Sequence, residues 1–191
     1  LCHDDAARQS GQGCGVCPSC HHFELKTHAD LKVILPEVLG LETGWPLESS
    51  AARDVEKKKR KPSLEIRIDA VRELLDFCQL TPSGPRDKVV VVHPCERLNT
   101  ASANALLKSL EEPPAGLVFI LVSHQPQQLL PTILSRCLKF PLTTPETADV
   151  VAWLKQGGVV NPEVALAAAG YSPLRALAED EPDAVSGLVL L

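Results

Sequence analysis

Two short apolar runs on either side of a helical pattern predict a parallel β-sheet. Residues 89–92 are four consecutive valines, and residues 117–122 are again entirely apolar. Strands of this kind are typical of sheets that helices cover on both faces. Between the runs, apolar side chains recur at helical spacing over residues 103–110, and two adjacent prolines then stop the helix. A strand, a helix and a strand in this order indicate an α/β fold with right-handed crossovers.

The same periodicity predicts further elements upstream. Residues 31–35 are typical of a buried strand, and the apolar positions of residues 68–78 predict a helix whose first free amides bond to Asp69. Residues 40–62 hold glycine, proline and a basic run without either period, which predicts an exposed loop. We expect the basic run, residues 57–61, to be a solvated loop rather than a DNA contact.

The pattern changes after Phe140 to short helices, which predicts a separate helical domain. A capping residue followed by proline opens each helix, at residues 144–145, 161–162 and 172–173. Glycines supply the turns between the helices.

Composition limits the functions open to this chain. Its net charge is -5 and no basic stripe dominates, so alone it should bind nucleic acid poorly. The longest apolar runs are far too short to cross a bilayer and the amino terminus lacks a signal-peptide pattern, so we expect a cytoplasmic protein without membrane contact. The chain starts at Leu1, contains no methionine and finishes on the apolar residues 184–191, so we expect both ends to be trimmed.

Four of the seven cysteines cluster near the amino terminus. They are Cys2, Cys14, Cys17 and Cys20. Two overlapping C-x2-C steps let thiolates reach one ion, and four sulfurs close a tetrahedral site with no open position. We therefore predict structural zinc in a module of residues 1–22. An iron–sulfur cluster or a redox dithiol is the alternative, and a disulfide is disfavoured in the cytosol.

The remaining cysteines and the nearby histidines lack such a pattern. His3, His21 and His22 could replace a cysteine ligand, but solvated surface side chains are favoured because four sulfurs suffice. The other cysteines are predicted to be small buried side chains. These are Cys78, Cys95 and Cys137.

The end of the valine strand argues against ATP hydrolysis. P-loop ATPases keep an acidic residue there to hold magnesium, often beside a glutamate that orients water. Here His93 and Pro94 follow the strand, and neither offers the hard oxygen that magnesium prefers. Glu96 is the nearest carboxylate and is expected to point elsewhere. The sequence contains no GxxxxGK[ST] phosphate loop. We expect no intrinsic ATPase activity.

Four sequence blocks within residues 66–142 resemble the clamp-loader branch of the AAA+ family. They read I-R-I-D-A-V-R-E-L, D-K-V-V-V-V, N-A-L-L-K-S-L-E-E-P-P and L-L-P-T-I-L-S-R-C. The cysteine module is similar to the zinc module of this branch, and His28 with Asp30 stands at its His-x-Asp step. The gap between Cys2 and Cys14 is longer than is usual in the branch.

The resemblance implies a fold and a domain organisation. It indicates an AAA+ P-loop-type parallel sheet core over residues 1–142, lacking its upstream P-loop region and first strand. The zinc module of residues 1–22 is inserted in this core. Residues 143–191 would form part of an all-helical lid domain, and the collar domain of the family lies outside these residues.

The resemblance also implies site residues. Arg136 is identified as an arginine finger that reaches ATP bound by a neighbouring subunit, where a planar, permanently charged guanidinium stabilises developing negative charge. Ser123 and Arg175 stand near the two sensor positions of the family, and the alternative for Arg175 is an ion pair with a carboxylate. Four residues of the third block are predicted only to form an exposed helix face. They are Asn104, Lys108, Glu111 and Glu112.

Within the branch, the gamma and tau subunits hydrolyse ATP and keep an Asp-Glu pair at the strand end. His93 and Pro94 therefore indicate the non-hydrolysing type of subunit. Its implied partners are the gamma or tau and delta subunits, with the sliding clamp and primed DNA reached through the assembled complex. The alternatives are a hydrolysing gamma or tau type subunit, or a zinc-dependent protein-interaction module on a decayed ATPase fold.

Overall fold

The structure is a computed structural model that describes residues 1–57, 59–84 and 86–180. The apolar residues 184–191 and the end of the predicted lid domain lie outside this range. The chain divides into two compact units, Leu1–Lys139 and a second that starts at Phe140. Among the described helices, none has the length and apolar character needed to cross a membrane.

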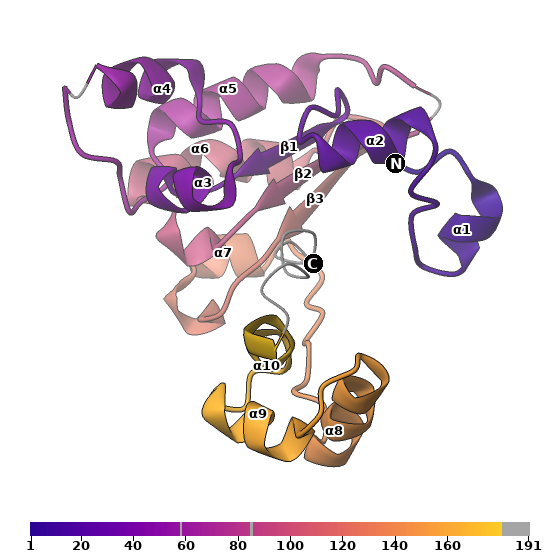
Figure 1. Cartoon of the computed structure of the whole chain (residues 1–191). Coiled ribbons are helices and arrows are strands. Elements are labelled where there is room, and N and C mark those ends of the chain that lie inside the picture. The colour runs from indigo at the N-terminus through magenta and orange to yellow at the C-terminus, as the bar shows by residue number, and fades with distance from the viewer. Residues whose placement is uncertain (58, 85, 181–191) are drawn as a thin grey trace. The chain divides into compact units, whose positions relative to one another are not determined.

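A parallel sheet of three strands forms the centre of the first unit (Figure 1). The strands are β1 (Leu31–Ile34), β2 (Lys88–Val92) and β3 (Leu117–Leu121), in the order β1-β2-β3. Val90 of β2 pairs with Lys32 on one side and Phe119 on the other. The predicted α/β fold with a parallel sheet is thereby confirmed.

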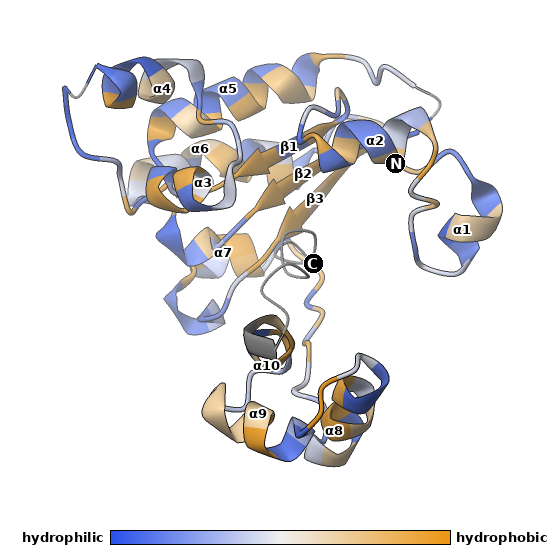
Figure 2. Cartoon of the chain, in the orientation of Figure 1, coloured by the Kyte–Doolittle hydropathy of each residue, from blue (hydrophilic) through white to orange (hydrophobic). Residues whose placement is uncertain are grey.

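Two helices, α5 (Ile68–Gln79) and α6 (Thr100–Glu111), cover one face of this sheet (Figure 1). Both match the helices predicted from periodicity. Val71 and Leu74 of α5 and Leu106 of α6 are fully buried against Val90 and Val92 of β2. Figure 2 shows the strands as hydrophobic along most of their length, in keeping with this shared core.

The opposite face of β3 is half-exposed among the residues that the structure describes. Val118 and Ile120 are 44% and 46% exposed, whereas Leu117 is buried on the helix-covered face. The sequence predicted burial on both faces, because this strand carries apolar side chains on both of them. In the part of the chain that the structure describes, that prediction is wrong for β3.

The predicted loop over residues 40–62 is also wrong, because it contains most of α3 (Glu37–Thr43) and all of α4 (Ser49–Glu56). Tertiary contacts stabilise these short helices. The buried carboxylate of Glu37 accepts hydrogen bonds from the Arg60 Nη2 at 2.8 Å and the Ser63 amide at 2.9 Å. These bonds join the start of the segment to its end. Arg60 is therefore an internal ion-pair partner rather than part of a solvated basic run.

Helix α5 begins two residues earlier than the predicted capping interaction of Asp69 requires. Arg67 occupies the position before the helix and makes no capping bond, and Asp69 lies within the first turn. Its carboxylate pairs instead with Arg72 at 3.1 Å. The predicted capping role of Asp69 is therefore wrong, although an acidic residue in the first turn still favours the helix dipole.

The described part of the second unit, up to residue 180, contains three short helices around its own apolar core. They are α8 (Thr147–Gln156), α9 (Pro162–Ala168) and α10 (Pro173–Asp180). Helices α9 and α10 start at the predicted prolines, whereas α8 starts later than predicted, after Glu146. Leu154 and Leu166 are almost fully buried in this core.

Candidate functional site

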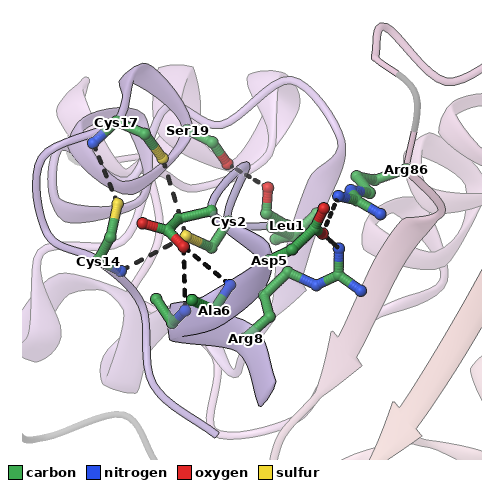
Figure 3. A network of polar contacts seen from close by, with 11 residues as sticks. Leu1, Cys2, Asp5, Ala6, Arg8, Cys14, Cys17, Ser19 and Arg86 are labelled. Carbon is green, nitrogen blue, oxygen red and sulfur yellow. Dashed lines mark hydrogen bonds and ion pairs between the residues drawn. The ribbon is translucent and has the colours of Figure 1, made fainter. Parts of the chain in front are cut away.

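The four amino-terminal cysteines, which flank α1 (Asp5–Gln9) or lie at the start of α2 (Pro18–Glu24), converge on one point. Figure 3 shows three of them, Cys2, Cys14 and Cys17. Their sulfur atoms all lie within 4.8 Å of one another. The Cys2 and Cys17 sulfurs are 4.0 Å apart, and those of Cys14 and Cys20 are 3.9 Å apart. A regular tetrahedron with zinc–sulfur bonds of about 2.3 Å has sulfurs about 3.8 Å apart, so the cluster fits such an ion. The four cysteines could therefore hold a metal.

The surrounding backbone favours thiolates in this cluster. The Cys14 amide donates to the Cys2 sulfur at 3.4 Å, and the Cys17 amide donates to the Cys14 sulfur at 3.3 Å (Figure 3). Hydrogen bonds from the backbone of His3 and Cys20 lower the pKa of Cys17 to about 6. Burial instead raises the pKa of Cys20 to about 12. A metal bound by all four sulfurs would hold Cys20 deprotonated as well.

Gly13 lies close to the cluster. A Cβ there would lie 3.2 Å from the Cys20 sulfur, closer than most such contacts. All seven cysteines are free thiols. His3, His21 and His22 are exposed and stand outside the four-sulfur group. Cys78 and Cys95 are buried as predicted, whereas Cys137 is only half-buried, so the prediction is wrong for Cys137.

A hydrogen-bond relay joins this cluster to the sheet. The Asp30 amide donates to His28 Nδ1 at 3.0 Å, so the proton of the neutral ring is on Nε2. That Nε2 donates to the Ser19 hydroxyl at 2.8 Å, and Ser19 in turn donates to the Leu1 carbonyl at 2.7 Å. Because burial lowers the pKa of His28, the neutral ring that this relay requires is favoured.

The relay ends on the residue before Cys2, which is the cysteine of the cluster most distant in sequence from the other three. Ser19 is 4% exposed and immediately precedes Cys20, so one hydroxyl fixes two arms of the cluster relative to each other. This contact explains how Cys2 reaches the site despite its long spacing from Cys14.

A second contact ties the cysteine module to the loop before β2. Arg86 of that loop donates to the Asp5 carboxylate of α1 at 2.7 Å, and Arg8 donates to the same oxygen at 2.8 Å (Figure 3). Asp30 also accepts from the Ser83 amide at 2.7 Å. The Arg86–Asp5 pair therefore joins the module to the strand-bearing core.

The carboxyl end of β2 leads into two histidine rings that pack against each other. His93 follows the strand, its ring packs edge-on against His124 with centroids 5.2 Å apart, and the His93–Pro94 peptide bond is cis. Burial lowers the pKa of His93, with His124 contributing, which favours the neutral ring. Neutral imidazole is a poor magnesium ligand.

The nearest carboxylate, Glu96, is used within the fold. It lies in the short helix η1 (Cys95–Arg97), and its Oε1 accepts from the His124 amide at 3.2 Å. Burial alone would raise the pKa of Glu96, but hydrogen bonds from its own amide, Ser123 and His124 hold it below its usual value. Glu96 thus joins η1 to the loop after β3, and Ser123 belongs to the same small network.

Arg136 lies two residues after the end of the short helix α7 (Pro131–Leu134), which the buried Ile133 anchors in the core. The Arg136 Nε donates to Glu111 Oε1 at 2.8 Å, and Nη2 donates to the same oxygen. Glu111 is the last residue of α6. The sequence predicted the exposed face to which Glu111 belongs, but spacing gave no signal for an ion pair that spans 25 residues.

The other predicted residues fall at separate places. Arg175 lies in α10 of the second unit and is exposed. Asn104 and Lys108 occupy the outward face of α6, as predicted from periodicity, and Glu112 follows that helix. The structure therefore unites the four cysteines with Ser19 and His28, which spacing alone did not select.

The fold and the site together define an α/β protein with a parallel sheet and a candidate four-cysteine metal centre. The family model described as "DNA polymerase III, delta subunit" matches residues 1–146. The chain therefore belongs to that family.

Relatives of this chain include delta' and tau subunits of DNA polymerase III. DNA polymerase III subunit delta' of Pseudomonas aeruginosa is 38% identical over 180 residues, which are 92% of this chain and 47% of the relative. The delta' subunit of Escherichia coli is 32% identical over 84% of this chain and 41% of its own length. The tau subunit of Escherichia coli is 36% identical over 68% of this chain and 16% of its own length.

This chain spans about half the length of the first of these relatives. Among solved structures, a gamma subunit-related protein of Thermotoga maritima aligns with a TM-score of 0.45 at 24% identity. That alignment covers 80% of this chain and 57% of the other.

Proposed function

We propose that this chain is part of a delta prime subunit of the bacterial DNA polymerase III clamp loader, a subunit that does not itself hydrolyse ATP. The observation that carries this proposal is the end of β2, where His93 and Pro94 stand and Glu96 is engaged by the His124 amide. Relatives named delta' support it, because they align with up to 92% of the chain, whereas the tau relative aligns with 68%. The hydrolysing gamma or tau type is therefore not favoured.

In this proposal the chain acts on ATP held by a neighbouring gamma or tau subunit. Arg136 would reach the transferred phosphoryl group in trans, where its planar guanidinium stabilises negative charge. Its place after α7, on the exposed surface of the first unit, supports such a role. Hydrolysis would then require a ring assembled with its gamma or tau and delta partners, around the sliding clamp and primed DNA.

The remaining assignments of the proposal concern organisation. Zinc would be the structural ion of the cysteine cluster, which the sulfur separations and the four-thiolate donor set support. Residues 1–142 would form an AAA+ core with the module of residues 1–22 inserted, and residues 143–191 would form part of a helical lid. Ser123 and Arg175 would be vestiges of the two sensors. The protein would act in the cytoplasm as a component of a DNA-directed DNA polymerase.

Reconstitution tests the proposal. ATP turnover is measured for the full-length protein alone, for its gamma or tau and delta partners alone, and for the complete mixture with clamp and primed DNA. We expect no turnover by the isolated protein and a large stimulation when it completes the complex. Turnover by the isolated protein would indicate the hydrolysing type. Failure to associate with the partners would indicate an interaction module outside replication.

A further inference from the structure

We propose that Glu111 holds Arg136 in an intramolecular ion pair that must open before the guanidinium can serve a neighbouring subunit. This inference rests on the proposed function of Arg136. One carboxylate oxygen of Glu111 accepts from both Nε, at 2.8 Å, and Nη2 of the guanidinium. These are the two nitrogens on one edge of the group, the edge that a phosphoryl group would otherwise bind bidentately.

The rest of the guanidinium is also engaged. Nη1 donates to the Thr132 carbonyl at 2.7 Å and approaches the Ser135 hydroxyl at 3.3 Å. An arginine has five N–H donors, and these contacts occupy four of them. The Glu111 carboxylate also neutralises the charge on which the stabilisation of a phosphoryl group depends. In this arrangement Arg136 cannot bind a phosphoryl group through two hydrogen bonds.

The position of Glu111 explains why the pair forms. Glu111 ends α6, where the helix dipole presents its negative end and a carboxylate is unfavourable unless a cation lies beside it. Leu110 on α6 and Ile133 on α7 are buried, so both helices are anchored in the core. Opening the pair therefore needs rotation of two side chains and no movement of the backbone.

The pair is weak enough to open on assembly. The side chains of Arg136 and Glu111 are 30% and 47% exposed, so solvent screens their attraction. An incoming phosphoryl group carries more negative charge than one carboxylate and can displace it. Glu111 is thus a positioning residue that holds the Arg136 guanidinium in the ion pair when no phosphoryl group is present.

The test substitutes Glu111→Gln in the full-length protein, assembled with its gamma or tau and delta partners. ATP turnover is measured without and with clamp and primed DNA. Glutamine keeps the shape of the side chain and removes its charge. We expect the unstimulated rate to rise by about two- to fivefold, the factor that corresponds to an exposed ion pair, with little change in the stimulated rate. Glu112→Gln, which removes the neighbouring exposed carboxylate, is the control and should leave both rates unchanged.

Two further measurements separate this inference from the proposed function. Exchange of the Arg136 Nε–H with solvent, followed by NMR on the full-length protein, should be faster in Glu111→Gln than in Glu112→Gln. Arg136→Ala in the same assembly should lose most of the stimulated rate. Suppose that Arg136→Ala does lose the stimulated rate. If Glu111→Gln then lowers the unstimulated rate, or leaves both this rate and the Nε–H exchange unchanged, the intramolecular pair does not restrain Arg136. In that case only this inference fails. If Arg136→Ala changes nothing, the finger assignment itself fails and the inference with it.

Discussion

Substitution of Ser19 by alanine should release metal from the cysteine cluster much faster. The Ser19 hydroxyl bridges His28 Nε2 and the Leu1 carbonyl, and its removal leaves one donor and one acceptor without their partner. Ser19 itself is 4% exposed, so water replaces the lost contacts poorly. An unsatisfied buried group costs about 1–3 kcal/mol.

The loss of these hydrogen bonds should weaken the docking of Cys2, because the relay fixes the residue immediately before it. A change of about 1–3 kcal/mol in the docked form corresponds to about a five- to 150-fold larger fraction of the open form. We therefore expect zinc to transfer to a chromogenic chelator about five- to 150-fold faster from Ser19→Ala than from the parent protein.

The assay follows chelator absorbance after mixing with the zinc-loaded, full-length protein. The matched control is Ser10→Ala, because Ser10 lies in the same module and its exposed hydroxyl donates only within its own turn, to the Ala7 carbonyl at 2.6 Å. Equal release rates for Ser19→Ala and Ser10→Ala would refute the view that the relay holds the Cys2 arm in place.

Three further predictions concern the core. Arg60→Ala should lower the free energy of unfolding, measured in urea, by about 2–4 kcal/mol, because it leaves the buried Glu37 carboxylate without its cation. A loss below about 0.5 kcal/mol would contradict a stabilising role of this ion pair. Burial lowers the pKa of His93 below its ordinary 6.5, so the unfolded chain binds a proton first and stability should fall as pH drops below 6.5. His93→Asn should flatten this dependence in urea titrations across that range, and His22→Gln should not. Lys88→Met should lower the Tm by about 3–10 °C, since the buried ammonium donates to the last carbonyls of α5, and an unchanged Tm would refute that role.

Periodicity was sufficient to predict the centre of the fold. The valines of β2 and the apolar face of α6 are signals that neighbouring residues carry, and both elements lie where predicted. The segment from Glu37 to Ser63 was missed because its stability comes from one buried carboxylate and its distant partners. Gly40, which suggested a loop, instead lets α3 approach Leu47, where a Cβ would come within 2.9 Å.

The candidate site likewise combines features that the sequence predicts with features that depend on the folded structure. The spacing of the cysteines predicted the cluster, since C-x2-C steps are local and chemically specific. The relay through Ser19 and His28 and the pair between Glu111 and Arg136 join residues that are close only after folding. Neither the relay nor the ion pair follows a recurring sequence spacing, so neither can be predicted from the sequence.

The most direct test of the central proposal separates catalysis from binding at the neighbouring subunit. In the complete assembly with clamp and primed DNA, single-turnover ATP hydrolysis and ATP affinity are measured for Arg136→Ala and Arg136→Lys. The control is Arg72→Ala, because Arg72 forms a comparable exposed ion pair with Asp69 on α5. A group that acts on the transition state changes the rate far more than the affinity. We expect both Arg136 variants to lose most of the hydrolysis rate with nearly unchanged ATP affinity, since lysine lacks the planar fork, and Arg72→Ala to match the parent. A rate unaffected by Arg136→Ala would contradict the proposal that this chain supplies an arginine finger.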